Sequence, residues 1–412
     1  MYYTKSNHLK HLSKEDLAVL MELCAYSNNL YNFGLYQVRQ HYFKEKKYLT
    51  YFSNLKICKE NENYRSIQAQ ISTRILQKVD IAMKSFFSLA KMVKKGSYPA
   101  NKLKLPRYRD KGGLYELDIP GTIVVVKGDK MKMPMSRLYR SSHPDFENLW
   151  LPFPEDLTGK TLKMVRVIPL YNGLHFKIEY IYEEPVVDLG LDKTQAIGID
   201  TGVNNLAACV TTLGTSFLID GKRLKSRNWY WNKEHTRLLT IAQKQGMEYT
   251  KRLAYMTLRR SNFQKDIMKK AARYIINYCI EHNIGTVICG SVSESHEPEK
   301  PFISIAFTTL SHTLEYLCEK YSMQFVSQDE SYSSQASFLD DDELPDYDPE
   351  HPYEGSFSGK RLHRGLYQSK DGSLINADLN GAANILRKCP LGFDFQKIDR
   401  KVLASPRKID VL

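Results

Sequence analysis

The sequence predicts a multidomain α+β protein, and three successive patterns along the chain support this fold class. Residues 11–95 carry apolar positions at helical spacing, which predicts a helical hairpin or a small bundle. Residues 96–190 change to short β-rich runs separated by Gly, Pro and Asp turns. After residue 190, strands and helices follow in the order β-β-β-α-β-α-β-α, which predicts a sheet with helices packed against it.

The helical part begins with a recognisable start signal. Ser13 followed by Asp16 forms an acidic variant of a capping box, and the apolar-periodic stretch behind it continues to Phe43. The helical period returns over residues 64–94. The Met, Leu and Phe stripe of these segments is typical of a packed core, so it is not interpreted as a ligand site.

The β-rich part contains three expected strands, at residues 122–126, 161–169 and 174–182. A small barrel or sandwich fits this pattern. In the last part, strands are expected over residues 197–200, 207–213, 215–219, 286–289 and 323–327, with a long basic helical region to about residue 283 and a helix over 303–321. Residues 340–370 are polar and predict a loop or small insertion, and the tail after Cys389 is expected to be partly disordered.

Two acidic residues occupy positions typical of metal-binding acids. Asp200 ends a buried apolar strand, and Asp378 stands near the start of an apolar-periodic helix, close to Asn376, Asn380 and Asn384. Either acid alone is a weak signal, because an Asp at a strand end often caps a turn and an Asp early in a helix often complements the helix dipole. Their order and spacing together resemble the first and last acids of a RuvC-type nuclease.

The charge distribution indicates a polyanionic partner. The net charge of the 412 residues is +13, and residues 222–270 hold fourteen Lys or Arg against three acids. A solvated helix face is the alternative interpretation. A second basic block, residues 91–111, interleaves Tyr98 and Tyr108 for possible base stacking, and two such blocks favour nucleic acid.

Composition also predicts the compartment. No run approaches the roughly 20 apolar residues that cross a bilayer, and the start lacks the apolar segment of a signal peptide. The seven cysteines are scattered without a Cys-x-x-Cys pair, which is typical of reduced core residues. We therefore expect no membrane partner, and a cytoplasmic, nucleoid-associated location in a prokaryote or a nuclear one in a eukaryote.

At the level of longer segments, the chain resembles the transposon-encoded TnpB family, which is related to compact type V CRISPR effectors and to the Fanzor group. The segments that carry the resemblance are NNLYNFGLYQVRQHYF, IQAQISTRILQKVDIAMKSFF, KLKLPRYRDK, GIDTGVNNLA and LINADLNGAANILRK. The resemblance implies an RNA-guided DNA endonuclease with an RNase H-like (RuvC) domain, a β-barrel wedge domain and a helical recognition domain. The implied divisions are residues 1–10 (first wedge strand), 11–95 (recognition), 96–190 (wedge), 191–390 (RuvC, with an insertion at about 335–375) and 391–412 (tail).

The middle catalytic acid departs from the family pattern. The family usually has a glutamate at the end of the fourth strand, where this chain has Gly290. Some relatives, including the Fanzor group, resemble a rearranged version in which a downstream glutamate takes the role, and the matching residue is Glu330. The alternative interpretation of Glu330 is a surface acid in a turn, as Asp329 is expected to be. Glu294 is a weaker candidate for the third acid.

A second departure is the absence of the family's four-cysteine zinc ribbon, so no structural zinc is expected. The segment in its place contains Lys360, Arg361, His363 and Arg364, which either contact phosphates or form a solvated basic loop.

The resemblance implies a two-magnesium mechanism, in which Mn²⁺ can substitute, with Asp200 bridging both ions and Glu330 and Asp378 completing the ligand set. Thr201 and Asn204 are expected to shape the turn at Asp200, and Asn384 to fasten the last helix. The expected partners are a guide RNA and target double-stranded DNA. The candidate nucleic-acid contacts are Lys102, Lys104, Arg107, Arg259, Arg260, Lys265, Lys269, Lys270, Lys360, Arg361 and Arg364.

Two other functions share part of this pattern. A nuclease-inactive, RNA-guided DNA-binding repressor would explain Gly290, although the retained Asp200 and Asp378 argue against it. A structure-selective nuclease without a guide would share the acids, but it would not need the helical and β-rich first half. The sequence does not define the oligomeric state.

Overall fold

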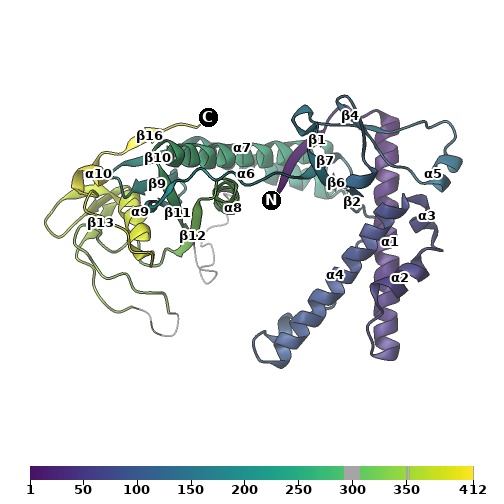
Figure 1. The fold of residues 1–412 in the computed structure, drawn as a ribbon, viewed down its shortest axis with the longest axis horizontal. Coiled ribbons are helices and arrows are strands. Elements are labelled where there is room, and N and C mark those ends of the chain that lie inside the picture. The colour runs from purple at the N-terminus through teal and green to yellow at the C-terminus, as the bar shows by residue number, and fades with distance from the viewer. Residues whose placement is uncertain (292–306, 349–350, 352, 412) are drawn as a thin grey trace. The chain divides into compact units, whose positions relative to one another are not determined.

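Two compact units, Met1–Glu184 and Pro185–Leu412, make up the chain in the computed structural model, which describes residues 1–291, 307–348, 351 and 353–411 (Figure 1). Both units contain helices and strands, so the expected α+β class is confirmed. Among the described residues, no helix combines the length and apolar character needed to cross a bilayer. The seven cysteines are free and buried, as expected for reduced core residues.

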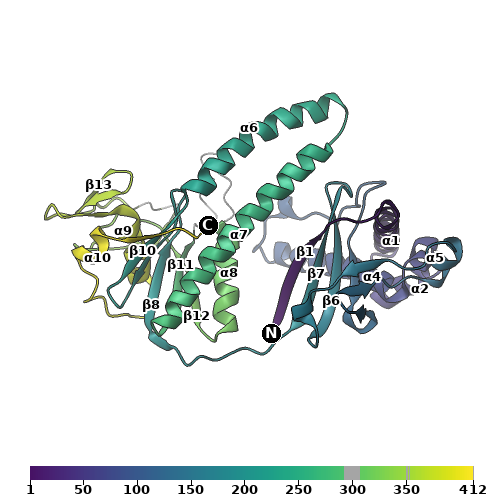
Figure 2. The same cartoon turned by 90° about the horizontal axis from the view of Figure 1, so that it is seen from above.

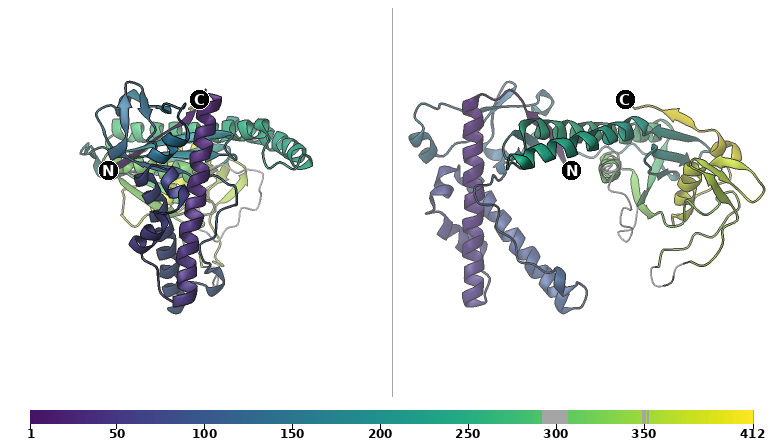
Figure 3. Two further views of the ribbon diagram at one scale, coloured as in Figure 1. Left: turned by 90° about the vertical axis from the view of Figure 1, so that its right-hand side faces the viewer. Right: turned by 180° about the vertical axis from the view of Figure 1, so that it is seen from behind.

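The first unit contains two long helices and several short ones. Its helices are α1 (Lys14–Glu45), α2 (Tyr51–Cys58), α3 (Glu62–Ser66), α4 (Ala69–Lys94) and α5 (Arg137–Ser142). Ser13 caps α1 as its sequence position predicts, because its side chain accepts a hydrogen bond of 3.0 Å from the backbone N–H of Asp16. Figures 1 and 3 show that α4 crosses α1 and diverges from it towards the C-terminal end of α4.

Two antiparallel sheets form the β-rich part of this unit. The larger sheet has the order β1-β7-β6-β2, and the smaller one has the order β3-β4-β5. The strands are β1 (Tyr2–Leu9), β2 (Leu117–Pro120), β3 (Val125–Lys127), β4 (Lys130–Lys132), β5 (Trp150–Pro152), β6 (Thr161–Leu170) and β7 (His175–Glu183). The single strand expected over 122–126 is wrong. The chain at Gly121 instead passes against the backbone of Leu162 and makes a 3₁₀ turn, Gly121–Ile123, before β3.

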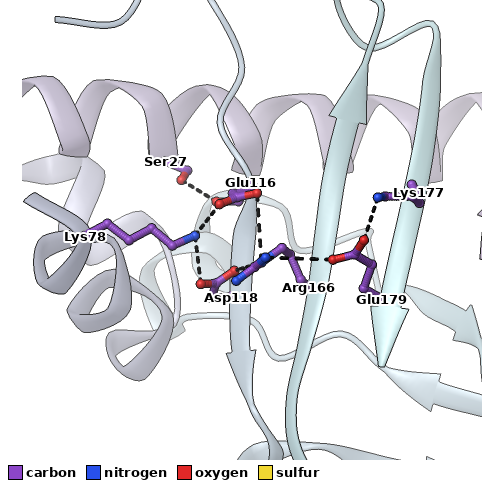
Figure 4. A network of polar contacts seen from close by, with 7 residues as sticks. All are labelled: Ser27, Lys78, Glu116, Asp118, Arg166, Lys177 and Glu179. Carbon is purple, nitrogen blue, oxygen red and sulfur yellow. Dashed lines mark hydrogen bonds and ion pairs between the residues drawn. The ribbon is translucent and has the colours of Figure 1, made fainter. Parts of the chain in front are cut away.

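The helices and the larger sheet of the first unit share one hydrophobic core, which includes Leu20, Leu76, Leu117 and Val165. A polar network at its edge joins the same elements (Figure 4). Lys78 of α4 forms ion pairs with Glu116 at 2.5 Å and with Asp118 of β2 at 2.7 Å. Arg166 of β6 reaches Asp118 at 2.8 Å, and the Ser27 hydroxyl of α1 donates to the Glu116 carbonyl at 2.9 Å. The helical and β-rich segments therefore form one compact body.

The second unit is built on a six-stranded sheet in the order β12-β11-β8-β9-β10-β16. Its strands are β8 (Asp192–Asp200), β9 (Asn205–Thr211), β10 (Ser216–Asp220), β11 (Ile284–Ser291), β12 (Gln324–Asp329) and β16 (Arg407–Ile409). Strands β8, β9 and β10 are antiparallel neighbours, whereas β11 is parallel to both β8 and β12. This arrangement is the expected RNase H-like sheet.

Helices cover both faces of this sheet. They are α6 (Lys222–Lys244), α7 (Lys251–Glu281), α8 (Phe307–Lys320), α9 (Ala377–Lys388) and α10 (Arg400–Ala404). One core joins α7 and α8 to one face, and another joins α9 and α10 to the other. The expected basic helical region is two helices, α6 and α7, which form the hairpin visible in Figure 2. Residues 303–306 of the expected helix over 303–321 lie outside the described residues.

Two segments contain more structure than the sequence predicts. The polar excursion includes a three-stranded sheet of β13 (Lys360–His363), β14 (Leu366–Gln368) and β15 (Leu374–Asn376). The expectation of a partly disordered tail is wrong, because β16 pairs with β10 and the side chains of Ile398 and Leu403 are buried. Burial of these apolar side chains supplies the stabilisation that the weak local pattern does not show.

Candidate active site

Three acidic residues stand at one edge of the six-stranded sheet. Asp200 is the last residue of β8, Glu330 directly follows β12, and Asp378 lies in the first turn of α9. Strands β8 and β12 both run parallel to β11 between them, so their C-terminal ends meet at the same edge. In this register Gly290 of β11 pairs with Gln328, two residues before Glu330.

The carboxyl group of Asp200 is under the electrostatic influence of the other two acids. Burial raises its pKa well above the ordinary value, and the negative charges of Glu330 and Asp378 raise it further. Arg361 and the backbone N–H of Thr201 act in the opposite direction. The three carboxyl groups therefore face a common space.

Two glycines leave room for these carboxyl groups. A Cβ atom at Gly290 would lie 2.8 Å from Glu330 Oε2 and 2.7 Å from Ile385 Cδ1. A Cβ atom at Gly381 would lie 2.7 Å from Asp200 Oδ2. The carboxyl group of Glu330 thus occupies the space beside β11 that a side chain at position 290 would enter.

Asp378 is held by two side chains in this structure. Its Oδ2 accepts a hydrogen bond of 2.8 Å from Asn205 Nδ2, and its Oδ1 forms an ion pair with Arg361 Nη2 at 2.9 Å. Asn376 caps α9 by accepting from the backbone N–H groups of Asp378 and Leu379. The sequence did not identify Asn205, although it directly follows Asn204 in the motif that contains Asp200.

The segment after Glu330 is fastened to α9 by two asparagines. Asn384 donates to the carbonyl oxygens of Ser333 at 2.9 Å and Ala336 at 2.7 Å, and Asn380 also donates to Ala336 at 2.7 Å. Asn384 thus has the structural role expected from the sequence. These bonds fix the start of the chain that leads away from Glu330.

The neighbouring Asp329 has different contacts from Glu330. It accepts from Lys388 Nζ at 3.0 Å and from the Ser331 hydroxyl at 3.0 Å. Burial raises its pKa, but these hydrogen bonds outweigh burial and hold the pKa below the ordinary value. Asp329 therefore anchors the end of α9, whereas Glu330 faces Asp200. Glu294, the rival for the third acid, lies outside the described residues.

A cavity of about 490 Å³ opens beside Asp378. Arg361, His363 and Arg364 of the β13–β14 hairpin line it from one side, and residues 202–204 line it from the other. Its cationic side chains beside an acidic cluster are suited to a phosphate diester, whose charge they would balance. Asn204 is fixed there, because its carbonyl accepts from Gly221 and its side chain accepts from Lys225 at 2.9 Å.

The other candidate nucleic-acid contacts are distributed over both units. Lys102, Lys104 and Arg107 are exposed in the first unit. That segment is tied to α1 through the Asn32 side chain, which donates to the Arg109 carbonyl at 3.0 Å and accepts from the Arg109 backbone N–H at 2.8 Å. The exposed residues of α7 and β13 in the second unit are Arg259, Lys265, Lys269, Lys270 and Lys360. Arg260 differs from them, since it is half-buried and donates to Asn228 Oδ1 at 3.1 Å.

Among the residues that the structure describes, no three His, Cys, Asp or Glu side chains are grouped as a metal centre requires. The three carboxylates nevertheless offer the hard oxygen ligands that divalent cations such as Mg²⁺ prefer. A cation between them would relieve the repulsion that raises the pKa of Asp200. The ion pair between Asp378 and Arg361 would have to open for Asp378 to become a ligand. The expectation that no zinc is needed stays a prediction.

Three comparisons place the chain among known proteins. A family model described as a probable transposase, OrfB of IS605, matches residues 179–296. The TnpB-like protein ORF457 of Acidianus two-tailed virus is 23% identical over 417 residues, which cover 90% of this chain and 83% of that protein. The cryo-EM structure of a Cas12f1–sgRNA–target DNA complex is similar with a TM-score of 0.53 and 16% identity, over 92% of this chain and 83% of that chain.

Proposed function

We propose that this chain, whose resemblance to the TnpB family is confirmed, is an RNA-guided DNA endonuclease that hydrolyses phosphodiester bonds in target DNA. The likeness to Cas12f1 supports the fold alone, so the activity is argued from the site. The guide RNA would select the target by base pairing, and the protein would read a short flanking motif in the duplex.

The observation that carries this proposal is the position of Glu330 over Gly290. Loss of the usual glutamate would leave two acids, which is too few hard ligands for two divalent ions. Here the Glu330 carboxyl occupies the space next to position 290, and its charge raises the pKa values of both Asp200 and Cys289 in addition to burial. In this proposal Glu330, which directly follows the neighbouring strand β12, supplies the third acid of the site.

The residues of the site have distinct roles in the proposed reaction. Asp200, Glu330 and Asp378 would hold two Mg²⁺ ions, with Mn²⁺ as a possible substitute, and the bound ions would activate water and stabilise the departing 3′ oxygen. Arg361 and Arg364 would hold the scissile phosphate in the adjoining cavity. Arg361 would exchange its ion pair with Asp378 for one with that phosphate. Substrate binding would in this way free the Asp378 carboxylate to bind a metal ion.

The remaining basic residues would bind the nucleic-acid backbone. In this proposal Lys102, Lys104 and Arg107 belong to the recognition and wedge part of the protein. Arg259, Lys265, Lys269 and Lys270 would follow the heteroduplex or the single strand along α7. Binding that depends on these contacts should weaken steeply with salt concentration, because counterions are released.

The test is a library assay with the protein and its co-purified RNA. The complex is mixed in magnesium buffer with plasmids that carry the guide-matched target beside randomised flanks, and binding and cutting are read from the same library. Wild type is expected to cut targets of one flank class. Asp200→Ala, Asp378→Ala and Glu330→Ala should each lower cleavage by at least about a hundredfold while RNA binding is retained.

A double variant isolates the role of Glu330. Gly290→Glu alone should be poorly active, because its side chain would collide with Glu330. Combined with Glu330→Ala, it should recover part of the lost cleavage, since the new carboxyl enters the vacated space. Full activity of Glu330→Ala would show that the third ligand is another residue, with Glu294 the next to test. Flank-specific binding without cleavage by wild type would favour the inactive repressor.

A further inference from the structure

A second cavity, of about 240 Å³, lies within the α6–α7 hairpin. We call it the hairpin pocket. It is lined by Arg227, Asn228, Tyr230 and Trp231 of α6 and by Met256, Arg259, Arg260 and Phe263 of α7. None of these residues belongs to the acidic site at the sheet edge, and every described residue of the lining comes from α6 or α7.

Asn228 contributes a buried hydrogen-bond donor to this pocket. Its side chain is 3% exposed, and its Oδ1 accepts from Arg260 Nε at 3.1 Å and from Gln264 Nε2 at 2.9 Å. Because the Arg260 guanidinium can only donate, it fixes which end of the Asn228 amide is oxygen. The Nδ2 group then finds no acceptor within the part of the chain that the structure describes.

Trp231 contributes a second donor of the same kind. Its Nε1 is buried and has no acceptor among the described residues. Its ring stacks with His235 at 4.3 Å between centroids, and the Arg260 guanidinium lies 3.9 Å from the ring centroid. Both neighbours contact the ring, so neither supplies an acceptor for the indole N–H. Two buried donors without acceptors are uncommon in folded proteins and call for an explanation.

The walls of the pocket are apolar or aromatic, with cations at its margin. Met256 and Phe263 are partly buried, whereas Tyr230 is 62% exposed. Arg227 lies with its guanidinium 4.0 Å from the Phe263 ring centroid, and Arg259 is exposed. A planar ring with hydrogen-bond acceptors on one edge and a phosphate on its other side would match the donors, the walls and the charge.

We propose that the hairpin pocket binds the base of an unpaired nucleotide, with acceptors on the base facing Asn228 Nδ2 and Trp231 Nε1. The attached phosphate lies toward Arg227 or Arg259. A free phosphate would not use the apolar walls, and a basic peptide would be repelled by the three arginines. The inference rests on the proposed function, which supplies the nucleic acid. It adds a contact to a base along α7, where the proposed function places contacts to the nucleic-acid backbone.

The experiment compares base-bearing with abasic oligonucleotides. Purified full-length protein is titrated by fluorescence anisotropy with labelled single strands of about 15 nucleotides, at the upper end of common site sizes. The probes are oligo(dT), oligo(rU), oligo(dA) and an abasic strand of equal charge. Wild type is expected to bind the thymine or uracil strands about tenfold more tightly than the abasic strand.

Two variants remove one donor each and keep the surrounding contacts. Asn228→Asp retains an oxygen for Arg260 and Gln264 but replaces the Nδ2 donor with an acceptor. Trp231→Phe removes the indole N–H and keeps an aromatic ring beside Arg260. Either change should abolish the difference between base-bearing and abasic strands. Asn262→Asp on the exposed side of α7 is the charge-matched control, and it should preserve that difference.

The outcomes separate this inference from the proposed function. If both variants melt like wild type and keep the preference for bases, the hairpin pocket does not bind a base. Equal affinity of wild type for all strands also contradicts the inference, while guided cleavage in the library assay would still stand. Preference for the RNA over the DNA strands would assign the pocket to the guide, and the reverse would assign it to the DNA.

Discussion

At the scale of single residues, Asp200 is a group whose ionisation opposes folding in the absence of metal. Its folded-state pKa is raised by burial and by Glu330 and Asp378. Below the ordinary Asp pKa, about 4, the group is protonated in both the folded and unfolded states. As the pH rises past that value, the unfolded chain releases its proton more readily, so the folded state loses relative stability until the raised pKa is passed.

The first prediction follows from the loss of folded-state stability as the pH rises. In metal-free buffer, Asp200→Asn should have a higher Tm than wild type at neutral pH, by a few degrees, and the same Tm near pH 4. Thermal melts across this pH range measure the difference. Asp371→Asn is the control with the opposite sign. Hydrogen bonds from Ser369 and Ser373 lower the pKa of Asp371 to about 2, so its contribution is present at neutral pH and is lost as the pH falls. An Asp200→Asn advantage that does not change with pH would contradict the electrostatic explanation.

The residues that sequence could identify are those with a local signature. Asp200 ends an apolar strand and Asp378 lies in the first turn of an apolar helix, so the neighbouring residues in the sequence identify both acids. Asn205 and Asn228 have no such signature, because their partners Asp378 and Gln264 are distant in sequence and only the fold brings them together. Glu330 was found by resemblance, and its position over Gly290 required the structure.

At the scale of elements, long segments with a clear period were predictable and short ones were not. The sequence indicated α1, α4, β6, β7 and the order of the central sheet, because each of these segments spans enough residues to show its period. Strands β13, β14, β15 and β16 have four residues or fewer, which is too short for such a pattern. β13, β14 and β15 pair with one another, whereas β16 is defined by its pairing with the distant strand β10.

The second prediction tests the contribution of the C-terminal segment. Leu403 of α10 is fully buried against the sheet face that α9 covers. Leu403→Ala should lower the free energy of unfolding of the second unit by about 2–5 kcal/mol, through lost burial and the cavity left behind. Urea titration followed by circular dichroism measures the change. Lys401→Ala, at an exposed position of the same helix, should have little effect. Equal, small effects of both changes would show that the tail does not stabilise the sheet.

At the scale of the whole molecule, the two compact units have separate hydrophobic cores. One core joins α1, α4 and the larger antiparallel sheet, and other cores hold the helices on the six-stranded sheet. The segment that joins the units includes Val186 and Leu189, which are 46% and 40% exposed, so no core is continuous through it. Units with their own cores can unfold as separate cooperative transitions.

The third prediction is that calorimetry of the RNA-free protein resolves two transitions, each responding to a substitution in one unit only. Leu76 of α4 is fully buried in the first unit, directly against Gly34 of α1. Leu76→Ala should lower the Tm of one transition, and Leu403→Ala should lower that of the other, because each removes packing from a different core. The double variant should then show both shifts, each on its own transition, because the two residues belong to different cores. A single transition that both substitutions move would mean that the units fold as one cooperative body. In that case bound RNA should raise the Tm of the single transition. If the transitions are separate, RNA that is bound by only one unit should raise the Tm of that unit alone.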